Sequence, residues 1–180
     1  MDAPTTHDPT AAARNWPDEI YDLLARRNVR HACYVPDAGH SGLISRFVSD
    51  PGATANVLTT EEEGIAIASG AWLGGERSVV LMQSSGVGNC INMLSLPVLA
   101  KIPLLLLVTM RGEWAEFNPW QVPMGQATEP SLNAIGITTM RADTPTDLIA
   151  TVAQAITMAF DADQQIAVLM GQRLLGEKQW

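Results

Sequence analysis

Charged side chains are scarce in this sequence, and basic ones are the scarcest. Charged residues make up 17% of the 180 residues, and 11 lysines and arginines stand against 19 aspartates and glutamates, for a formal net charge of −8. The basic residues are scattered, and Arg26 and Arg27 are the only adjacent pair. We therefore expect neither a nucleic acid nor an anionic membrane as a partner, because a protein that binds either one needs clustered positive charge.

Long apolar runs, a leader sequence and clustered cysteines are missing as well. The longest strongly apolar run, Ile102–Val108, is too short to cross a bilayer. The first residues contain no apolar segment of the kind found in secretory signals. Cys33 and Cys90 lie far apart in apolar stretches, without the spacing of metal ligands. These absences predict a cytoplasmic protein with two buried, reduced thiols and no membrane contact.

Apolar residues, at 47%, are what the sequence has in quantity. A chain of this length and composition can bury a sizeable core, so we expect one folded domain over residues 15–180. Residues 1–14 are polar, alanine-rich and punctuated by proline, which predicts a flexible N-terminal tail.

Strand and helix patterns alternate along this domain. The run PLLLLVT from Pro103 is apolar throughout, as expected for a central strand buried on both faces. Thr144, Pro145 and Asp147 have the spacing of an N-cap, a first-turn proline and a capping-box acid, which predicts a helix over 148–160. The expected strands are 31–35, 54–58, 78–82, 103–109, 137–140 and 165–169.

This alternation predicts an α/β fold, with a doubly wound, mostly parallel six-stranded sheet and helices on both faces. Ligands bind such sheets at the carboxyl ends of the strands. The loops expected there are 36–40, 59–63, 83–89 and 109–126.

The most unusual stretch is Thr59–Gly75. It begins with the acids Glu61–Glu63, which suit the first turn of a helix but repel one another. Ala66, Gly70 and Gly74 then recur every four residues and leave one helix face almost bare. From the pattern alone, this is either a buried helix with a solvated acidic start, or a surface that another backbone or a flat ligand can approach closely.

The common sequence motifs for nucleotide, hydrolase and metal sites are absent or incomplete in this sequence. Gly86 and Gly88 follow an expected strand, but Ile91 stands where a dinucleotide fingerprint needs its third glycine, and no acid lies about twenty residues further on. The sequence has no P-loop and no G-x-S-x-G elbow, and its three histidines form no metal pair. We therefore expect no metal site in this chain, and residues 84–88 predict a tight strand-to-helix turn.

Four motifs in order resemble one enzyme family. The segment TEEEGIAIASGA from Thr60 is similar to the pyrimidine-binding domain of thiamine-diphosphate enzymes, where a glutamate lies nine residues before a glycine, as Glu61 does before Gly70. The loop from Gln83 to Asn89 resembles the next loop of that site. The motifs VPD from Val35 and QVPMG from Gln121 resemble the alpha subunits of the two-chain decarboxylases of 3-sulfopyruvate, with phosphonopyruvate decarboxylase as close kin.

The resemblance implies a flavodoxin-like domain and assigns roles to its residues. Glu61 is implied as the catalytic carboxyl group, which hydrogen-bonds the pyrimidine ring of the cofactor, while Glu62 and Glu63 are structural. Glu61 is joined in the implied cofactor site by Gln83, Ser85, Gly86 and Asn89. The polar members of that loop otherwise serve only to cap the next helix.

Substrate contacts are expected in two other loops. Arg111 is the only arginine on an expected carboxyl-end loop, and its planar fork suits a sulfonate or phosphonate. His40 and Gln121 can add neutral donors, and Asp37 lies in the same loop as His40. The nearby aromatic residues can exclude water from the reaction or pack against a partner; they are Trp114, Phe117 and Trp120.

The sequence lacks one motif that the enzyme family needs for its cofactor. The family binds diphosphate and Mg²⁺ through G-D-G and a later asparagine on a second domain, and this sequence has no G-D-G. The resemblance thus implies a separate beta subunit that holds diphosphate and Mg²⁺, with the active site at a hetero-oligomer interface formed partly by the Gly64–Gly74 helix. The implied reaction is decarboxylation of 3-sulfopyruvate to sulfoacetaldehyde. The alternatives are phosphonopyruvate or another 2-oxo acid as substrate, a non-catalytic regulatory subunit, and a stand-alone flavin- or nucleotide-binding module.

Overall fold

A parallel sheet of six strands forms the centre of the protein, in the order β2-β1-β3-β4-β6-β5. The computed structural model describes residues 16–176, so the predicted tail at 1–14 lies outside the described residues. The strands are β1 (Val29–Tyr34), β2 (Thr54–Val57), β3 (Arg77–Gln83), β4 (Leu104–Thr109), β5 (Thr138–Ala142) and β6 (Gln165–Met170). The predicted α/β sheet is confirmed, and β1 with β3 marks the point where the strand order reverses.

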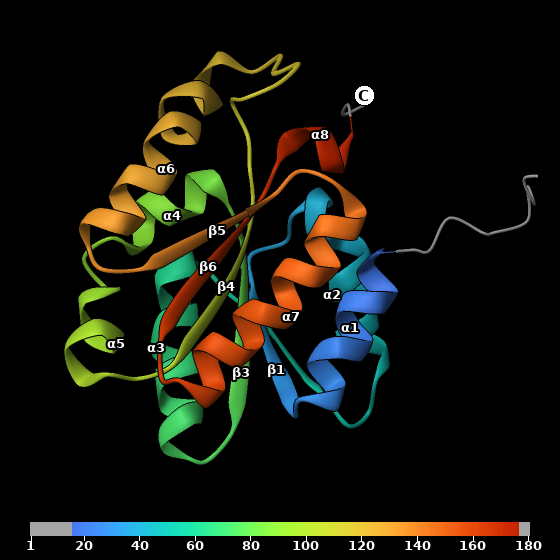
Figure 1. The fold of residues 1–180 in the computed structure, drawn as a ribbon, viewed down its shortest axis with the longest axis vertical. Helices are drawn as coiled ribbons and strands as arrows, with labels where there is room; N and C mark the ends of the chain where they lie inside the picture. The colour runs from blue at the N-terminus through green and yellow to red at the C-terminus, as the bar shows by residue number, and fades with distance from the viewer. Residues whose placement is uncertain (1–15, 177–180) are drawn as a thin grey trace, which may run out of the picture.

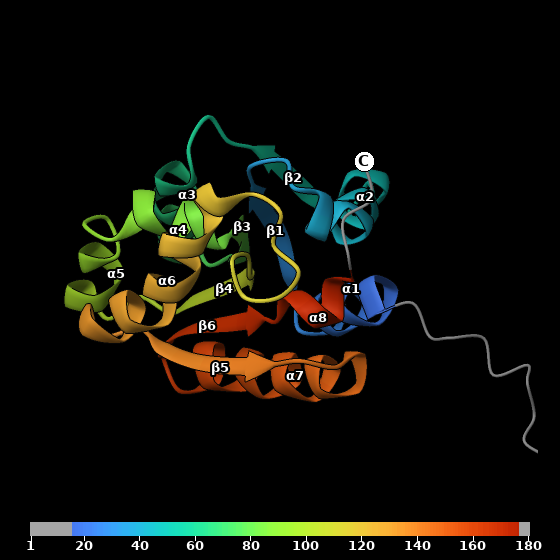
Figure 2. The same cartoon turned by 90° about the horizontal axis from the view of Figure 1, so that it is seen from above.

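Helices cover both faces of this sheet (Figures 1 and 2). One face carries α1 (Trp16–Arg26), α2 (Ser41–Ser49) and α7 (Pro145–Asp161). The other carries α3 (Glu61–Leu73), α4 (Ser84–Cys90), α5 (Ser95–Ala100) and α6 (Val122–Ala134). Three one-turn helices, η1 (Ala38–His40), η2 (Pro119–Gln121) and α8 (Gln172–Leu175), lie in the connections.

Strand β4 separates two apolar cores. All of its residues are buried, with Leu105 and Leu107 in the core beneath α1, α2 and α7. Leu104, Leu106 and Val108 point into the core beneath α3, α4 and α6. The continuous apolar run therefore forms a central strand buried on both faces, as predicted.

The predicted tight turn at 84–88 is wrong, because α4 begins at Ser84, directly after β3. Glycine is a poor helix former, but at position 86 it is needed for packing. The backbone of Gly86 lies so close to Glu61 that a Cβ at this position would overlap its Oε1. The loop expected at 109–126 is too long, because α6 already begins at Val122; this helix carries Pro130 within it. Gly125 is needed in α6, since its Cβ would lie 2.0 Å from the Arg111 carbonyl oxygen.

Four connections meet at the carboxyl end of the sheet. β1 leads into η1, β3 into α4, β4 into the loop from Met110, and β6 into α8. Since β1, β3, β4 and β6 are neighbours in the sheet, these connections lie side by side and form the edge where a ligand is expected. Among the helices within residues 16–176, none is long and apolar enough to span a bilayer.

Candidate active site

Glu61 is the buried member of the acidic triplet. It is the first residue of α3 and is 9% exposed, whereas Glu62 and Glu63 are exposed. Its Oε2 accepts a hydrogen bond from the side-chain amide of Asn89 at 2.9 Å. Glu63 turns back to accept the backbone N–H of Thr59, the residue before the N-cap Thr60, at 2.8 Å. The three acids therefore differ in their surroundings, although all three lie in the first turn of the same helix.

The backbone of α4 packs directly on the Glu61 carboxyl group. Gly86 makes this possible, because any side chain there would overlap Oε1, Cδ and Cγ of Glu61. Cys90, one turn further along α4, is fully buried. Burial and the nearby charges of Glu61 and Glu62 raise the pKa of the Cys90 thiol to about 12, so it stays neutral. Glu61, Gly86 and Asn89 are thus brought together, at the junction of α3 and α4.

Asp37 forms a second cluster with β3 and β4. Its Oδ2 accepts the hydroxyl of Thr109 at 2.7 Å, and its Oδ1 accepts the side-chain amide of Gln83 at 3.3 Å. Gln83 in turn accepts the hydroxyl of Ser85 on Oε1 at 2.8 Å. Gln83 is the N-cap of α4, yet within the described chain its side chain makes no capping bond. The two clusters are connected through α4, which carries Ser85 and Gly86 in succession.

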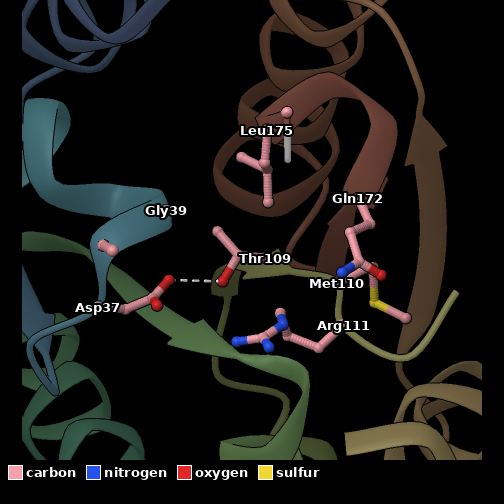
Figure 3. A pocket seen from close by; sticks show the side chains of 9 residues that line it. Asp37, Gly39, Thr109, Met110, Arg111, Gln172 and Leu175 are labelled. Carbon is pink, nitrogen blue, oxygen red and sulfur yellow. Dashed lines mark hydrogen bonds between the residues drawn. The ribbon is translucent and has the colours of Figure 1, made fainter. Parts of the chain in front are cut away.

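A small pocket of about 90 Å³ opens between β1, β4 and β6 (Figure 3). The Asp37 carboxylate and the Arg111 guanidinium both reach toward it from different loops. Its lining residues are Asp37, Ala38, Gly39, Thr109, Met110, Arg111, Gln172, Leu175 and Gly176. Asp37 and Arg111, both predicted to contact substrate, are therefore brought to one pocket.

Arg111 is held by a buried ion pair. Its Nε and Nη2 donate to the two carboxylate oxygens of Glu116, at 2.7 and 2.5 Å, and the two side chains are 8% and 4% exposed. Glu116 also accepts the backbone N–H groups of Gly112 and Asn118 and the side-chain amide of Gln172. The hydrogen bonds from Arg111 are the main cause that lowers the pKa of Glu116 to about 2. Glu116 therefore organises the loop after β4 and occupies one edge of the guanidinium fork.

Sequence patterns did not identify Glu116 or Gln172. Gln172 lies just after β6 and accepts the backbone N–H groups of Glu113 and Trp114, both at 3.0 Å. These contacts join positions 58 to 59 residues apart, which no local period can predict. The sequence offered one signal for the Arg111–Glu116 pair: the acid lies five residues after the arginine in the same loop.

His40 and Gln121 do not line the pocket. His40 is fully buried, and its Nε2 lies 3.0 Å from the Leu107 carbonyl oxygen. Burial lowers the pKa of His40 below its ordinary value, so the ring is neutral near pH 7. Gln121 ends η2, and within residues 16–176 its buried Oε1 has no hydrogen-bond partner. Neither side chain is therefore among those that line the pocket with Asp37 and Arg111.

Helix α3 has one packed face and one open face. On the packed face, a Cβ at Gly64 would lie 2.8 Å from Leu58 and 2.9 Å from Val80. On the open face, no atom of the described chain comes within 4 Å of a Cβ built at Gly70. Ile67 and Leu73 flank this point and are 38% and 78% exposed. The bare face that the small residues predict is therefore turned outward, as are the aromatic rings of Trp114, Phe117 and Trp120.

Comparison with known proteins places these features in context. No protein-family model matches the chain. Sulfopyruvate decarboxylase subunit alpha of Methanocaldococcus jannaschii is 34% identical over 151 residues, which cover 83% of this chain and 89% of that protein. The same subunit of Methanococcus maripaludis is 31% identical over 157 residues, covering 87% and 94%. Phosphonopyruvate decarboxylase of Streptomyces viridochromogenes is 41% identical over 96 residues, which are 52% of this chain and 24% of that protein.

Solved structures share the fold at low sequence identity. 2-Oxoglutarate:ferredoxin oxidoreductase from Magnetococcus marinus matches with a TM-score of 0.72 at 15% identity, over 89% of this chain. Benzoylformate decarboxylase from Polynucleobacter necessarius matches with a TM-score of 0.71 at 19% identity, over 93% of this chain. The chain spans 29% and 31% of those two proteins, respectively, so its fold corresponds to one part of each.

Proposed function

The chain belongs to the family of sulfopyruvate decarboxylase alpha subunits, and from this premise we propose that it is the pyrimidine-binding half of a thiamine-diphosphate-dependent decarboxylase. The proposed reaction converts 3-sulfopyruvate to sulfoacetaldehyde and CO₂ in an assembly with a second chain. The observation that carries the proposal is the buried Glu61, fixed by Asn89 and backed by Gly86.

The residues around Glu61 fit the pyrimidine ring of thiamine diphosphate. The Asn89 amide holds Oε2 of the carboxyl group, and Glu61 is 9% exposed, so the residue is buried without being fully enclosed by this chain. When bound, the cofactor supplies the electron sink that decarboxylation of a 2-oxo acid requires. Glu61 would hydrogen-bond the ring nitrogen and exchange a proton with it at a carboxyl oxygen. Gly86 would support this by letting α4 shield the carboxyl group from water.

Asp37 and Arg111 are the proposed substrate contacts of this chain. Both line the small pocket next to Ser85 and Gln83, whose polar side chains we assign to the cofactor or substrate rather than to helix capping. Arg111 shares its charge with Glu116, so it would offer an anion only the part of its guanidinium outside that pair. A cationic group of the partner chain is the alternative anion site.

His40 and Gln121 fit supporting roles better. The buried, neutral His40 ring holds η1 against β4 through the Leu107 carbonyl. Gln121 lies at the entry to α6 and is not among the residues that line the pocket. We therefore propose direct substrate contact for neither residue in the arrangement described.

A second chain would complete the site. Among the described residues, no cluster of histidine, cysteine, aspartate or glutamate has the geometry to hold a metal ion. We propose that a beta subunit supplies the diphosphate and Mg²⁺ contacts and docks on the open face of α3, where Ile67, Gly70 and Leu73 are exposed. The two free, buried cysteines support a reducing compartment, and we propose the cytoplasm.

Phosphonopyruvate decarboxylation is the second candidate, favoured by the 41% identity over 96 residues to the Streptomyces viridochromogenes enzyme. A regulatory subunit without turnover is disfavoured by the retained Glu61–Asn89 pair. Calorimetric titration of thiamine diphosphate into the chain, with and without the co-expressed partner, tests the proposal. We expect weak binding to the single chain and tight binding to the complex. Equal binding to both would contradict a site divided between two chains.

A further inference from the structure

The hydroxyl of Thr109 is aimed at the Asp37 carboxylate from inside the protein. Thr109 ends β4, is 1% exposed, and places Oγ1 2.7 Å from Asp37 Oδ2. Its other acceptor, the Met82 carbonyl oxygen, is more distant at 3.4 Å. Since hydrogen bonds to a charged acceptor are shorter and stronger, the hydroxyl proton goes to Asp37.

The chain is shaped to bring these two groups together. A Cβ on Gly39 would lie 2.8 Å from Thr109 Cγ2 and 2.9 Å from Asp37 Oδ2. A side chain at position 39 would thus push Asp37 and Thr109 apart. The close approach of η1 to β4 explains why glycine stands here.

Gln83 holds the second oxygen of the carboxylate. Its amide nitrogen lies 3.3 Å from Asp37 Oδ1, while its amide oxygen accepts the Ser85 hydroxyl at 2.8 Å. The two contacts fix the orientation of the Gln83 amide, because the nitrogen must face Asp37 and the oxygen must face Ser85. Donors from two neighbouring strands, β3 and β4, therefore hold both oxygens of Asp37.

The opposite charge of the pocket has its own partner. Arg111 is paired with Glu116 in the loop after β4. Each charged group of the pocket is therefore tied to a separate support, while both residues line the same pocket. A carboxylate fixed in advance avoids the cost of reorganisation when substrate binds.

We propose that Thr109 is a positioning residue that fixes the Asp37 carboxylate at the pocket, with Gln83 as its second support. The inference rests on the proposed function, in which Asp37 contacts the substrate. Thr109 also lines the pocket, but its hydroxyl is directed to Asp37, and the proposed role is exerted through that carboxylate.

A double-mutant cycle on the assembled enzyme tests this. Thr109→Val removes the hydroxyl at nearly constant volume, Thr109→Ser restores it, and Asp37→Asn removes the charge that it holds. We expect Thr109→Val to lower kcat/KM for sulfopyruvate at least tenfold, through the same parameter, kcat or KM, that Asp37→Asn changes. Thr109→Ser should recover activity to within about threefold of the unmodified enzyme.

The cycle also separates positioning from stability. In the Asp37→Asn background, Thr109→Val should cost no further activity. Thr128→Val is the matched control, because Thr128 is also buried and donates its hydroxyl to a backbone carbonyl, that of Met124. This control should lower Tm about as much as Thr109→Val and leave kcat/KM unchanged.

Three outcomes would overturn the inference. If the effects of Thr109→Val and Asp37→Asn multiply in the double variant, Thr109 does not act through Asp37, while the role of Asp37 itself stands. If Asp37→Asn retains full activity, the substrate role of Asp37 in the proposed function fails, and Thr109 has nothing to position. Failure of Thr109→Ser to recover activity would likewise show that packing, and not the hydroxyl, matters.

Discussion

The side-chain amide of Asn89 donates a hydrogen bond to Oε2 of Glu61 at 2.9 Å, joining the first turn of α3 to the end of α4. This contact distinguishes Glu61 from its two acidic neighbours, which are exposed. It holds a buried carboxyl group in one orientation, as a group that exchanges protons with a bound ring requires. The proposed division of labour among the three acids follows from it.

Glu61→Gln should remove most decarboxylation while leaving the fold and partner binding intact. The amide keeps the shape and can still accept from Asn89, but it cannot exchange a proton with the cofactor. We expect kcat to fall by roughly 10²-fold or more in the assembled enzyme. Glu62→Gln is the matched control and should change kcat little, because Glu62 is exposed. A larger loss in Glu62→Gln than in Glu61→Gln would show that the catalytic carboxyl group is misassigned.

Gly70→Leu should block assembly and yet stabilise the isolated chain. No atom of residues 16–176 lies within 4 Å of a Cβ at this position, and leucine gains helix propensity over glycine by roughly 0.5–1 kcal/mol. Size-exclusion chromatography with the partner should show separate species, while Tm of the single chain should rise or stay constant. Ala150→Leu, at an exposed site of α7 on the other face of the sheet, should leave assembly unchanged. Assembly of Gly70→Leu with normal affinity would move the interface away from α3.

Arg111→Ala should affect both stability and substrate choice. It leaves the Glu116 carboxylate buried without its cation, which costs roughly 3–5 kcal/mol of unfolding free energy. The double variant Arg111→Ala/Glu116→Gln should be more stable than Arg111→Ala alone, because no unpaired charge remains. In steady-state kinetics, Arg111→Ala should raise KM for sulfopyruvate at least tenfold and change KM for pyruvate little. Equal losses on both substrates would assign Arg111 to the fold or the interface.

The buried His40 should make the protein less stable in mild acid. Burial lowers the pKa of His40 in the folded state below the ordinary 6.5. As the pH falls, His40 is therefore protonated in the unfolded chain before it is protonated in the folded chain. The free energy of unfolding therefore decreases as the pH falls below about 6.5, and His40 accounts for at most about 1.4 kcal/mol of this decrease per pH unit. The charge of Asp37 works against this effect but does not reverse it. Urea unfolding between pH 8 and 5 should show a shallower loss for His40→Gln, and an identical slope would contradict the assignment.

Local patterns predicted the framework of this protein well. The apolar run at Leu104–Thr109 became the central strand, and Thr144 caps α7 by accepting the N–H of Asp147 at 3.2 Å, as its spacing predicts. These features depend on neighbours within a few residues, so the sequence displays them directly. The bare face of α3 was likewise visible in the spacing of its small residues, but the pattern left open whether that face was buried or, as at Gly70, open.

Contacts between distant segments could not be predicted in this way. The glycines of α4 indicated a turn, since glycine disfavours a helix. Gly86 lies in a helix because its backbone packs against Glu61 of α3, and this contact cannot be seen in the local sequence. The support of the Arg111–Glu116 pair by Gln172 depends on β4 and β6 being neighbours. The burial of His40 against Leu107 likewise follows from the packing of η1 on β4.

The most direct test of the account is the release of CO₂ from 3-sulfopyruvate by the purified chain, alone and after assembly with its partner, in the presence of thiamine diphosphate and Mg²⁺. The account predicts no turnover from the single chain, sustained turnover from the complex, and loss of that turnover when the complex carries Glu61→Gln. Sustained turnover by the single chain, or full turnover by the Glu61→Gln complex, would contradict it.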